Sequence, residues 1–102
     1  MGGIMNQYMI RRRIAWASPA ELEATAKRST EVADAEFSDS IRWIRSYVVE
    51  ESDGTLGTVC IYEARDQNAV REHAGRVGMP ADEVLAIADT VIVRPDPEPV
   101  NT

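Results

Sequence analysis

Three stretches of the chain have the two-residue hydrophobic period of β-strands. Side chains alternate between two faces from Tyr8 to Trp16 and again from Ile41 to Val49. Asp53-Gly54 is a typical hairpin signal, so the apolar segment from Thr58 to Ala64 is predicted to return beside the second stretch as a third strand. In the first strand, alternation places these residues on one side: Tyr8, Ile10, Arg12, Ile14 and Trp16.

Two other segments have the signatures of helices. Ser18-Pro19-Ala20-Glu21 combines a capping serine, a proline at the first helical position and a glutamate three residues after the serine, which predicts a helix from Pro19 to Phe37. A second helix is predicted from Gln67 to Val77, capped by Asp66 and closed by Gly78. The inner face of the first helix is predicted to consist of mostly small side chains: Leu22, Thr25, Ala26, Ser29, Val32, Ala33 and Phe37.

The segment from Val84 to Val93 is predicted to hold the last strand, most securely from Thr90 on. The element order is then strand, helix, strand, strand, helix, strand. Two split β-α-β halves joined by a hairpin predict a ferredoxin-like α+β sandwich, with two helices on one face of a four-stranded antiparallel sheet. We expect this domain over residues 7–94, between a flexible N-terminus (1–6) and a proline-rich acidic tail (95–102).

Large apolar groups occur on both faces of the predicted sheet. In the second strand, strict alternation puts Trp43, Arg45 and Tyr47 on one side, with Ile44 and Val48 on the other. An uncovered face with such side chains is an unusually large exposed patch. We therefore expect a homodimer packed sheet on sheet, of the dimeric α+β barrel type. The alternative is a monomer whose open aromatic face binds a peptide or ligand.

Composition narrows the range of partners and locations. The 102-residue chain has 11 Lys and Arg against 17 Asp and Glu, and this net charge of −6 argues against a nucleic-acid backbone as partner. No apolar run approaches the roughly 20 residues of a membrane span, and the start lacks a signal peptide, so a cytoplasmic location is expected. A single cysteine and a single histidine exclude an intrachain disulfide and any site that needs two imidazoles from one chain.

Four segments of the chain carry a family resemblance: Ile41-Arg42-Trp43-Ile44-Arg45-Ser46-Tyr47-Val48, Val59-Cys60-Ile61-Tyr62-Glu63-Ala64, Val70-Arg71-Glu72-His73-Ala74 and Gly78-Met79-Pro80-Ala81-Asp82. With Tyr8 and Arg12 in the opening strand, the chain resembles the small nickel-binding ferredoxin-like bacterial proteins, formerly a domain of unknown function. The resemblance implies a ferredoxin-like subunit, a homodimer and, for at least one member, nickel at the dimer surface. The long hairpin loop from Glu50 to Gly57 departs from the family, and the motif itself assigns no nickel ligands.

Three residues are candidate metal ligands. His73 is the only imidazole, a group that suits nickel, zinc and copper, although its helical position toward the sheet also fits a structural histidine. Cys60 lies in the middle of a strand and is either a thiolate ligand or a small core residue. Glu63 shares a strand face with apolar neighbours, which is unusual for a carboxylate, although a place near the strand end also lets it reach water.

A second group of residues predicts either a ligand pocket or a dimer interface. Because the first and third strands are neighbours in this fold, Arg12 is expected to pair with Glu63, as a structural ion pair or as part of a ligand site. Aromatic side chains and a second arginine are expected around that pair. The full set is Arg12, Trp43, Arg45, Tyr47 and Tyr62.

These observations leave open more than one class of function. The first is a non-catalytic nickel-binding protein that acts as a metal sink or responder. The second is a cofactor-free enzyme of the dimeric α+β barrel type, monooxygenase-like or cyclase-like, acting on a small organic substrate. The third is an interaction module. A cavity between sheet and helices discriminates among them, because a closed core argues against an enzyme.

Overall fold

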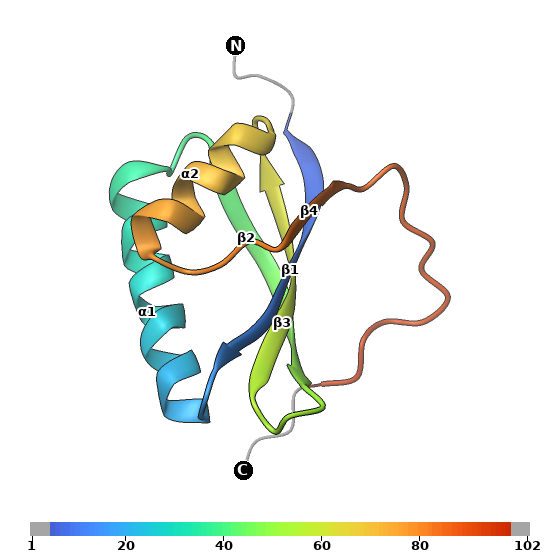
Figure 1. The fold of residues 1–102 in the computed structure, drawn as a ribbon. Helices are drawn as coiled ribbons and strands as arrows, with labels where there is room; N and C mark the ends of the chain where they lie inside the picture. The colour runs from blue at the N-terminus through green and yellow to red at the C-terminus, as the bar shows by residue number, and fades with distance from the viewer. Residues whose placement is uncertain (1–4, 99–102) are drawn as a thin grey trace.

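The computed structural model describes residues 5–98 and contains the six elements in the predicted order. Their bounds are β1 (Asn6–Trp16), α1 (Pro19–Glu36), β2 (Ile41–Glu50), β3 (Leu56–Ala64), α2 (Gln67–Val77) and β4 (Glu83–Ala86). The sheet order is β2-β3-β1-β4 with antiparallel neighbours, and both helices lie on the same face (Figure 1). This is the predicted ferredoxin-like α+β fold. Residues 1–4 and 99–102, which include parts of both predicted termini, lie outside the described residues.

The helix boundaries follow from the capping residues. Ser18 Oγ accepts a hydrogen bond from the Glu21 N–H at 3.3 Å, and the Glu21 carboxylate accepts one from the Ala17 N–H at 2.6 Å. At the start of α2, Asp66 Oδ1 accepts from the Ala69 N–H at 2.8 Å. Gly78 closes α2 in the left-handed conformation, with φ 84°. Both helices therefore begin and end within a residue of their predicted limits.

The last strand is much shorter than the sequence predicts. β4 pairs with β1 only from Glu83 to Ala86, and one further hydrogen bond joins the Ile87 N–H to the Gln7 carbonyl. Because β4 runs antiparallel to β1, it reaches the beginning of β1 at that point and has no partner left. The prediction of a strand secure from Thr90 on is therefore wrong. Beyond the sheet lie three strongly exposed apolar residues, Val91, Ile92 and Val93, whose exposed fractions are 85%, 75% and 79%.

A bulge in β1 changes which side chains face the helices. The pairing with β3 shifts register between Arg12 and Trp16, and Ile14 has a φ of 50°, a conformation that branched residues rarely adopt. Arg12 and Trp16 are buried beneath the helices, whereas Ile14 is 61% exposed. The prediction that Ile14 shares their face is wrong, because strict alternation does not account for a bulge.

A second bulge has the same effect in β2. Trp43 pairs with Tyr62, but the next paired residue is Arg45, opposite Ile61, so Ile44 is the extra residue. Trp43 faces the helices, while Arg45 and Tyr47 point to the opposite, outer face of the sheet. The prediction that these three side chains share one face is therefore wrong.

The core lies between the sheet and the helices, chiefly beneath α2. It contains Tyr8, Ile10, Ile41, Cys60, Tyr62, Ala64, Ala69, Val70 and Val84. α1 packs more closely on α2 than on any strand. Within residues 5–98, no helix combines the length and the apolar character needed to cross a membrane.

Candidate functional site

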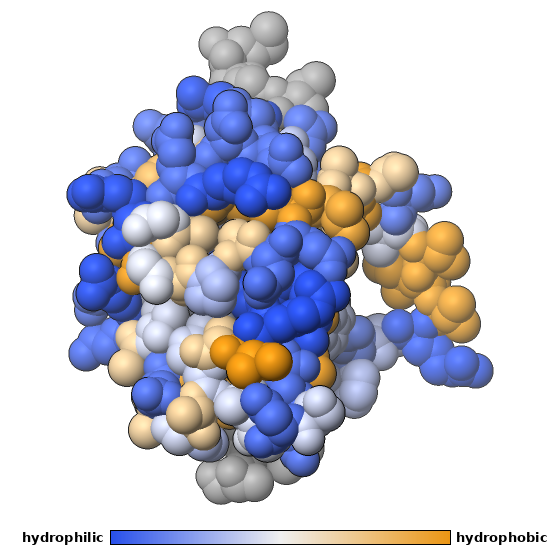
Figure 2. All heavy atoms as spheres, in the orientation of Figure 1, coloured by the Kyte–Doolittle hydropathy of each residue, from blue (hydrophilic) through white to orange (hydrophobic). Residues whose placement is uncertain are grey.

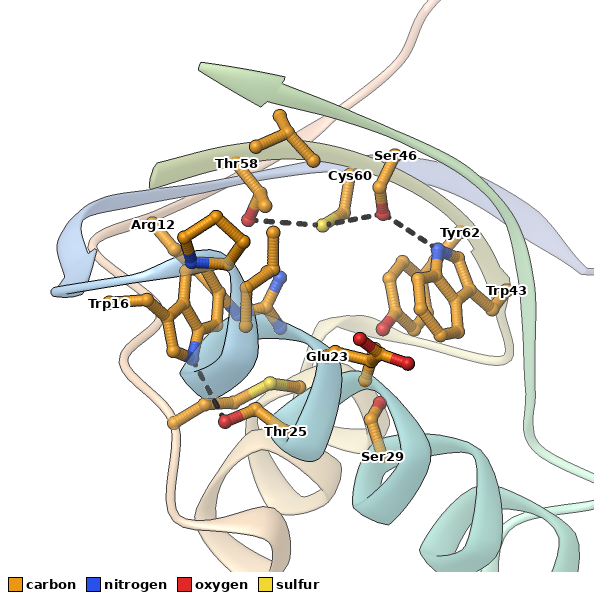
Figure 3. A pocket seen from close by; sticks show the side chains of 15 residues that line it. Arg12, Trp16, Glu23, Thr25, Ser29, Trp43, Ser46, Thr58, Cys60 and Tyr62 are labelled. Atoms are coloured by element: carbon orange, nitrogen blue, oxygen red, sulfur yellow. Dashed lines mark hydrogen bonds between the residues drawn. The ribbon is translucent and has the colours of Figure 1, made fainter. Parts of the chain in front are cut away.

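A cavity of about 270 Å³ lies between the helix-covered face of the sheet and the first half of α1 (Figure 3). It follows from the sequence of α1, whose inner face is built of small residues such as Thr25, Ala26 and Ser29 and so leaves space above the sheet. The larger side chains that line it are Trp16, Leu22, Trp43, Val48, Tyr62 and Met79. The cavity therefore has mainly apolar and aromatic walls, as small-molecule sites do.

Arg12 supplies the one cationic side chain among the residues that line this cavity. It is 1% exposed, and none of its three guanidinium nitrogens has a hydrogen-bond partner within the described part of the chain. The guanidinium carbon lies 6.0 Å from the centre of the Tyr62 ring. Buried arginines are normally paired, so this side chain is the most unusual polar group in the structure.

The β1 bulge that follows Arg12 is held by Glu51, from the hairpin loop. The Glu51 carboxylate accepts hydrogen bonds from Arg11 Nη2 at 2.9 and 3.1 Å and from the Ile14 N–H at 2.9 Å. The hydrogen bonds from Arg11 and from the Ile14 backbone lower the pKa of Glu51. Gly57 makes this arrangement possible, because an added Cβ would lie 2.4 Å from the Arg12 carbonyl oxygen.

A row of hydrogen bonds crosses the sheet side of the cavity. Trp43 Nε1–H donates to Ser46 Oγ at 2.8 Å, and the Ser46 hydroxyl donates to Cys60 Sγ at 3.0 Å. The Cys60 thiol donates in turn to Thr58 Oγ1 at 3.3 Å (Figure 3). Trp43 also stacks on Tyr62, with ring centres 6.1 Å apart and planes inclined by 9°. These contacts hold the aromatic wall in one orientation.

Tyr62 and His73 both have pKa values displaced by burial. Desolvation raises the pKa of Tyr62, partly opposed by the positive charge of Arg12. Desolvation lowers the pKa of His73, a hydrogen bond from its ring to the Ser29 carbonyl opposes that shift, and Arg12 adds to it. Both groups are therefore neutral near pH 7.

His73 lies between the two helices and is 1% exposed. Its Nε2 is 3.0 Å from the Ser29 carbonyl oxygen, so Nε2 carries the proton and donates it. Nδ1 has no partner among the described residues. The edge of Phe37 lies against the ring, with centroids 5.5 Å apart. This buried environment is that of a structural histidine.

The three predicted metal ligands are not brought together in one protomer. Cys60 is in the cavity wall and His73 lies between the helices, whereas Glu63 is on the outer face, 3.2 Å from Arg42. Across residues 5–98, no three or more His, Cys, Asp or Glu side chains are arranged to hold a metal ion. Each of the three residues remains a prediction as a metal ligand.

The expected pairing of Arg12 with Glu63 does not form. Arg12 lies opposite Thr58 in the β1–β3 ladder, and Glu63 lies opposite Gln7, so the two side chains are five residues apart along β3 and on opposite faces. The prediction is wrong because neighbouring strands bring side chains together only where register and face both agree.

Of the five residues predicted to form a pocket or an interface, three line the cavity: Arg12, Trp43 and Tyr62. Arg45 and Tyr47 instead bind the C-terminal segment on the outer face. Arg45 Nη1 and the Tyr47 hydroxyl each donate to Asp96 Oδ2 at 2.6 Å. The hydrogen bond from Tyr47, followed by that from Arg45, lowers the pKa of Asp96.

Several residues of the site were not assigned to it by sequence reasoning. Trp16 and Leu22 were placed on the correct inner faces, so their positions were available from the pattern, although their part in a cavity was not. Glu51 and Met79 lie in predicted turns, where no periodicity indicates a direction. Their roles follow only from the folding of distant segments onto one another.

Fold and site together define the class as a ferredoxin-like α+β protein with a small cavity between sheet and helices. The sequence model of the family described as nickel responsive protein SCO4226-like matches residues 8–87, and the chain belongs to this family. The crystal structure of SCO4226 from Streptomyces coelicolor A3(2) is similar in fold, with a TM-score of 0.67 and 19% sequence identity over 83% of this chain and 99% of that chain. Among proteins with curated descriptions, none matches this chain in sequence.

Proposed function

We propose that the protein binds nickel and responds to it without catalysing a reaction. The observation that carries this proposal is membership of a nickel responsive family over residues 8–87. The net charge of −6 supports it, because a surplus of carboxylates attracts divalent cations. The cavity favours binding over catalysis, since its single thiol, Cys60, is hydrogen bonded into the wall and its neighbours include no imidazole.

The proposed active form is a homodimer joined through the outer face of the sheet. Tyr47 and Leu85 are exposed on that face. The C-terminal segment is bound to it through Asp96, and the chain before Asp96 stands away from the sheet (Figure 1). A groove of about 730 Å³ lies between the segment and the sheet. Part of the segment is apolar, since Val91, Ile92 and Val93 are exposed, and orange spheres stand beside the body of the molecule (Figure 2). Each copy thus presents both an apolar groove and an apolar segment, so two copies related by a two-fold axis can fill each other's grooves.

The proposed metal position is where the two outer faces meet. One protomer does not assemble three donors within residues 5–98, so a second protomer supplies the remaining ligands. Glu63 is the predicted ligand on that face, and nickel would replace Arg42 as the partner of its carboxylate. His73 and Cys60 are both buried on the helix side of the sheet, where this proposal gives them structural roles.

Calorimetric titration with nickel, combined with light scattering, tests this proposal. The wild-type protein is expected to scatter as a dimer and to bind one nickel ion per dimer. Glu63→Gln is expected to weaken binding by about tenfold or more, equivalent to one lost ligand. Glu72→Gln is the matched control, because it removes the same charge from an exposed position on α2.

His73→Gln distinguishes a wrong metal position from a wrong proposed function. It is expected to lower the melting temperature while leaving nickel affinity unchanged. Loss of nickel binding in His73→Gln but not in Glu63→Gln would move the metal from the outer face to the space between the helices. A wild-type protein that binds no nickel at all would contradict the proposed function itself.

A further inference from the structure

We propose that the cavity beneath α1 is a binding site for a small organic carboxylate, with Arg12 as its anchor. The inference starts from a buried cation that has no counter-ion. A guanidinium carries five N–H donors and no acceptor, and burial without partners is strongly unfavourable. A carboxylate that enters the cavity supplies both the negative charge and the hydrogen-bond acceptors, through the bidentate pairing that arginine forms with carboxylates.

No carboxylate within residues 5–98 forms an ion pair with Arg12. Glu23 is the one acidic residue that lines the cavity, but it forms no ion pair with Arg12 and its side chain is exposed. Glu51 approaches the same bulge and is occupied by Arg11 and the Ile14 backbone. Glu63 points to the other face of the sheet. The negative charge therefore has to come from a ligand.

The size and the walls of the cavity define the rest of the ligand. A cavity of about 150 Å³ is enough for benzene, so about 270 Å³ holds one ring with a short carboxylate chain. Leu22, Val48 and Met79 offer apolar contact, and the stacked pair of Trp43 and Tyr62 offers aromatic surface (Figure 3). An aromatic or branched aliphatic monocarboxylate fits these features.

Several polar groups of the wall are already hydrogen bonded to one another. Ser46, Cys60 and Thr58 bond one another in series, and Trp16 Nε1–H donates to Thr25 Oγ1 at 2.9 Å. Arg12 is the charged group of the wall, and its guanidinium donors have no partner within residues 5–98. The cavity therefore selects a ligand with one negative charge and an apolar body. Such a site favours monocarboxylic acids over dicarboxylic acids and sugars.

This site is separate from the proposed nickel site. A divalent cation is repelled by an unpaired guanidinium, so the cavity does not suit nickel. An organic anion is attracted by the same charge. Ligand binding in the cavity can therefore be measured with a chelator present, and its outcome does not depend on whether the protein binds nickel.

Phenylacetate and its neutral amide, phenylacetamide, are matched probes for the cavity. Titration followed by tryptophan fluorescence is informative because both tryptophans, Trp16 and Trp43, line the cavity. We expect the acid to bind about tenfold or more tightly than the amide, which corresponds to one charged hydrogen-bonded pair. Benzoate and 4-methylpentanoate extend the series to a shorter and a non-aromatic acid.

Arg12→Met is the decisive variant, because methionine fills similar space without charge. It is expected to abolish the preference for the acid and to raise the melting temperature, since it removes an unpaired buried charge. Arg45→Met is the matched control on the outer face, and it is expected to keep the preference. Equal binding of acid and amide by the wild-type protein would overturn the proposal, as would an Arg12→Met variant that still prefers the acid.

Glu23→Gln tests the remaining internal explanation. If Glu23 neutralised Arg12 in solution, Arg12→Met and Glu23→Gln would each lower the melting temperature, and the proposal would be overturned. Our expectation is that Glu23→Gln leaves the melting temperature unchanged and strengthens acid binding slightly. Failure of all three acids to bind at millimolar concentration would also overturn the proposal.

Discussion

The two faces of the sheet have similar apolar content but differ in what covers them. On the inner face, the helices bury most side chains of β1 and β3, and the guanidinium of Arg12 has no partner within residues 5–98. On the outer face, aromatic and aliphatic groups remain exposed, and the charged residues there are paired. Each face is therefore incomplete in a different way. The inner face lacks an anion, and the outer face lacks an apolar cover.

The bulges decide which face of the sheet the charged and aromatic side chains occupy. The bulge between Arg12 and Trp16 inserts two residues and turns Ile14 outward, whereas the bulge at Ile44 inserts one residue and reverses the alternation of β2 beyond it. Without the second bulge, Arg45 and Tyr47 would lie in the cavity beside Trp43. The bulge places them on the outer face instead, where they bind Asp96. The cavity consequently keeps one cation rather than two.

The largest expected difference in stability between the faces is that between two tyrosine substitutions, one on each face. Tyr62 is 2% exposed and Tyr47 is 45% exposed. Tyr62→Ala is expected to lower the free energy of unfolding by about 3–5 kcal/mol, because it removes a buried ring. Tyr47→Ala is expected to change it by no more than about 0.5 kcal/mol in a protein at low concentration. Urea denaturation measures both, and equal losses would show that the outer face is covered in solution.

Gly57 marks the place where the outer side of the sheet is as tightly packed as the inner side. An added Cβ would meet Glu51 Oε2 at 2.2 Å and the Arg12 carbonyl oxygen at 2.4 Å. Gly57→Ala is expected to cost about 1–3 kcal/mol through overpacking. Gly75→Ala is the control, since nothing lies within 4 Å of its Cβ and alanine favours a helix by about 1 kcal/mol. Thermal melts showing no loss for Gly57→Ala would contradict the close approach of Glu51.

A smaller effect is expected at Ile14, where β1 passes from the inner to the outer register. Its φ of 50° is strained for a branched residue, and asparagine tolerates that conformation better. Ile14→Asn is expected to raise the free energy of unfolding by about 1 kcal/mol. Ile14→Val, which stays branched, is expected to give no gain. A lower stability for Ile14→Asn in urea would mean that Ile14 makes apolar contacts in solution.

The smallest expected effect is the pH dependence of stability, which differs between His73 on the helix side of the sheet and Asp96 on the outer face. Burial lowers the pKa of His73 from its ordinary value of 6.5, so the unfolded chain binds a proton first as the pH falls. Stability is therefore expected to decline below about pH 6.5. The pKa of Asp96 is lowered from 3.8, so its contribution is expected to be lost only in stronger acid. Denaturation between pH 8 and pH 5 would show no such slope in His73→Gln, and a persistent slope would contradict this assignment.

Periodicity and capping residues were sufficient to predict the elements, their order and the fold. Ser18 and Asp66 begin the helices, Gly78 ends the second one, and two-residue alternation identifies the strands, all through contacts within a few residues along the chain. The same local reasoning failed for the last strand. Whether Thr90 to Val93 pairs depends on how far β1 extends, and β1 is far from this segment in the sequence.

Local sequence determined that Arg12 lies on an otherwise apolar strand face and that α1 presents small residues toward the sheet. Only the tertiary structure decided that these two features line a cavity and that no carboxylate of residues 5–98 reaches the guanidinium. The physical reason is that strand register, bulges and the spacing between helix and sheet arise from packing between distant segments. Alternation specifies a side chain's face up to the first bulge, and beyond it the partner strand decides.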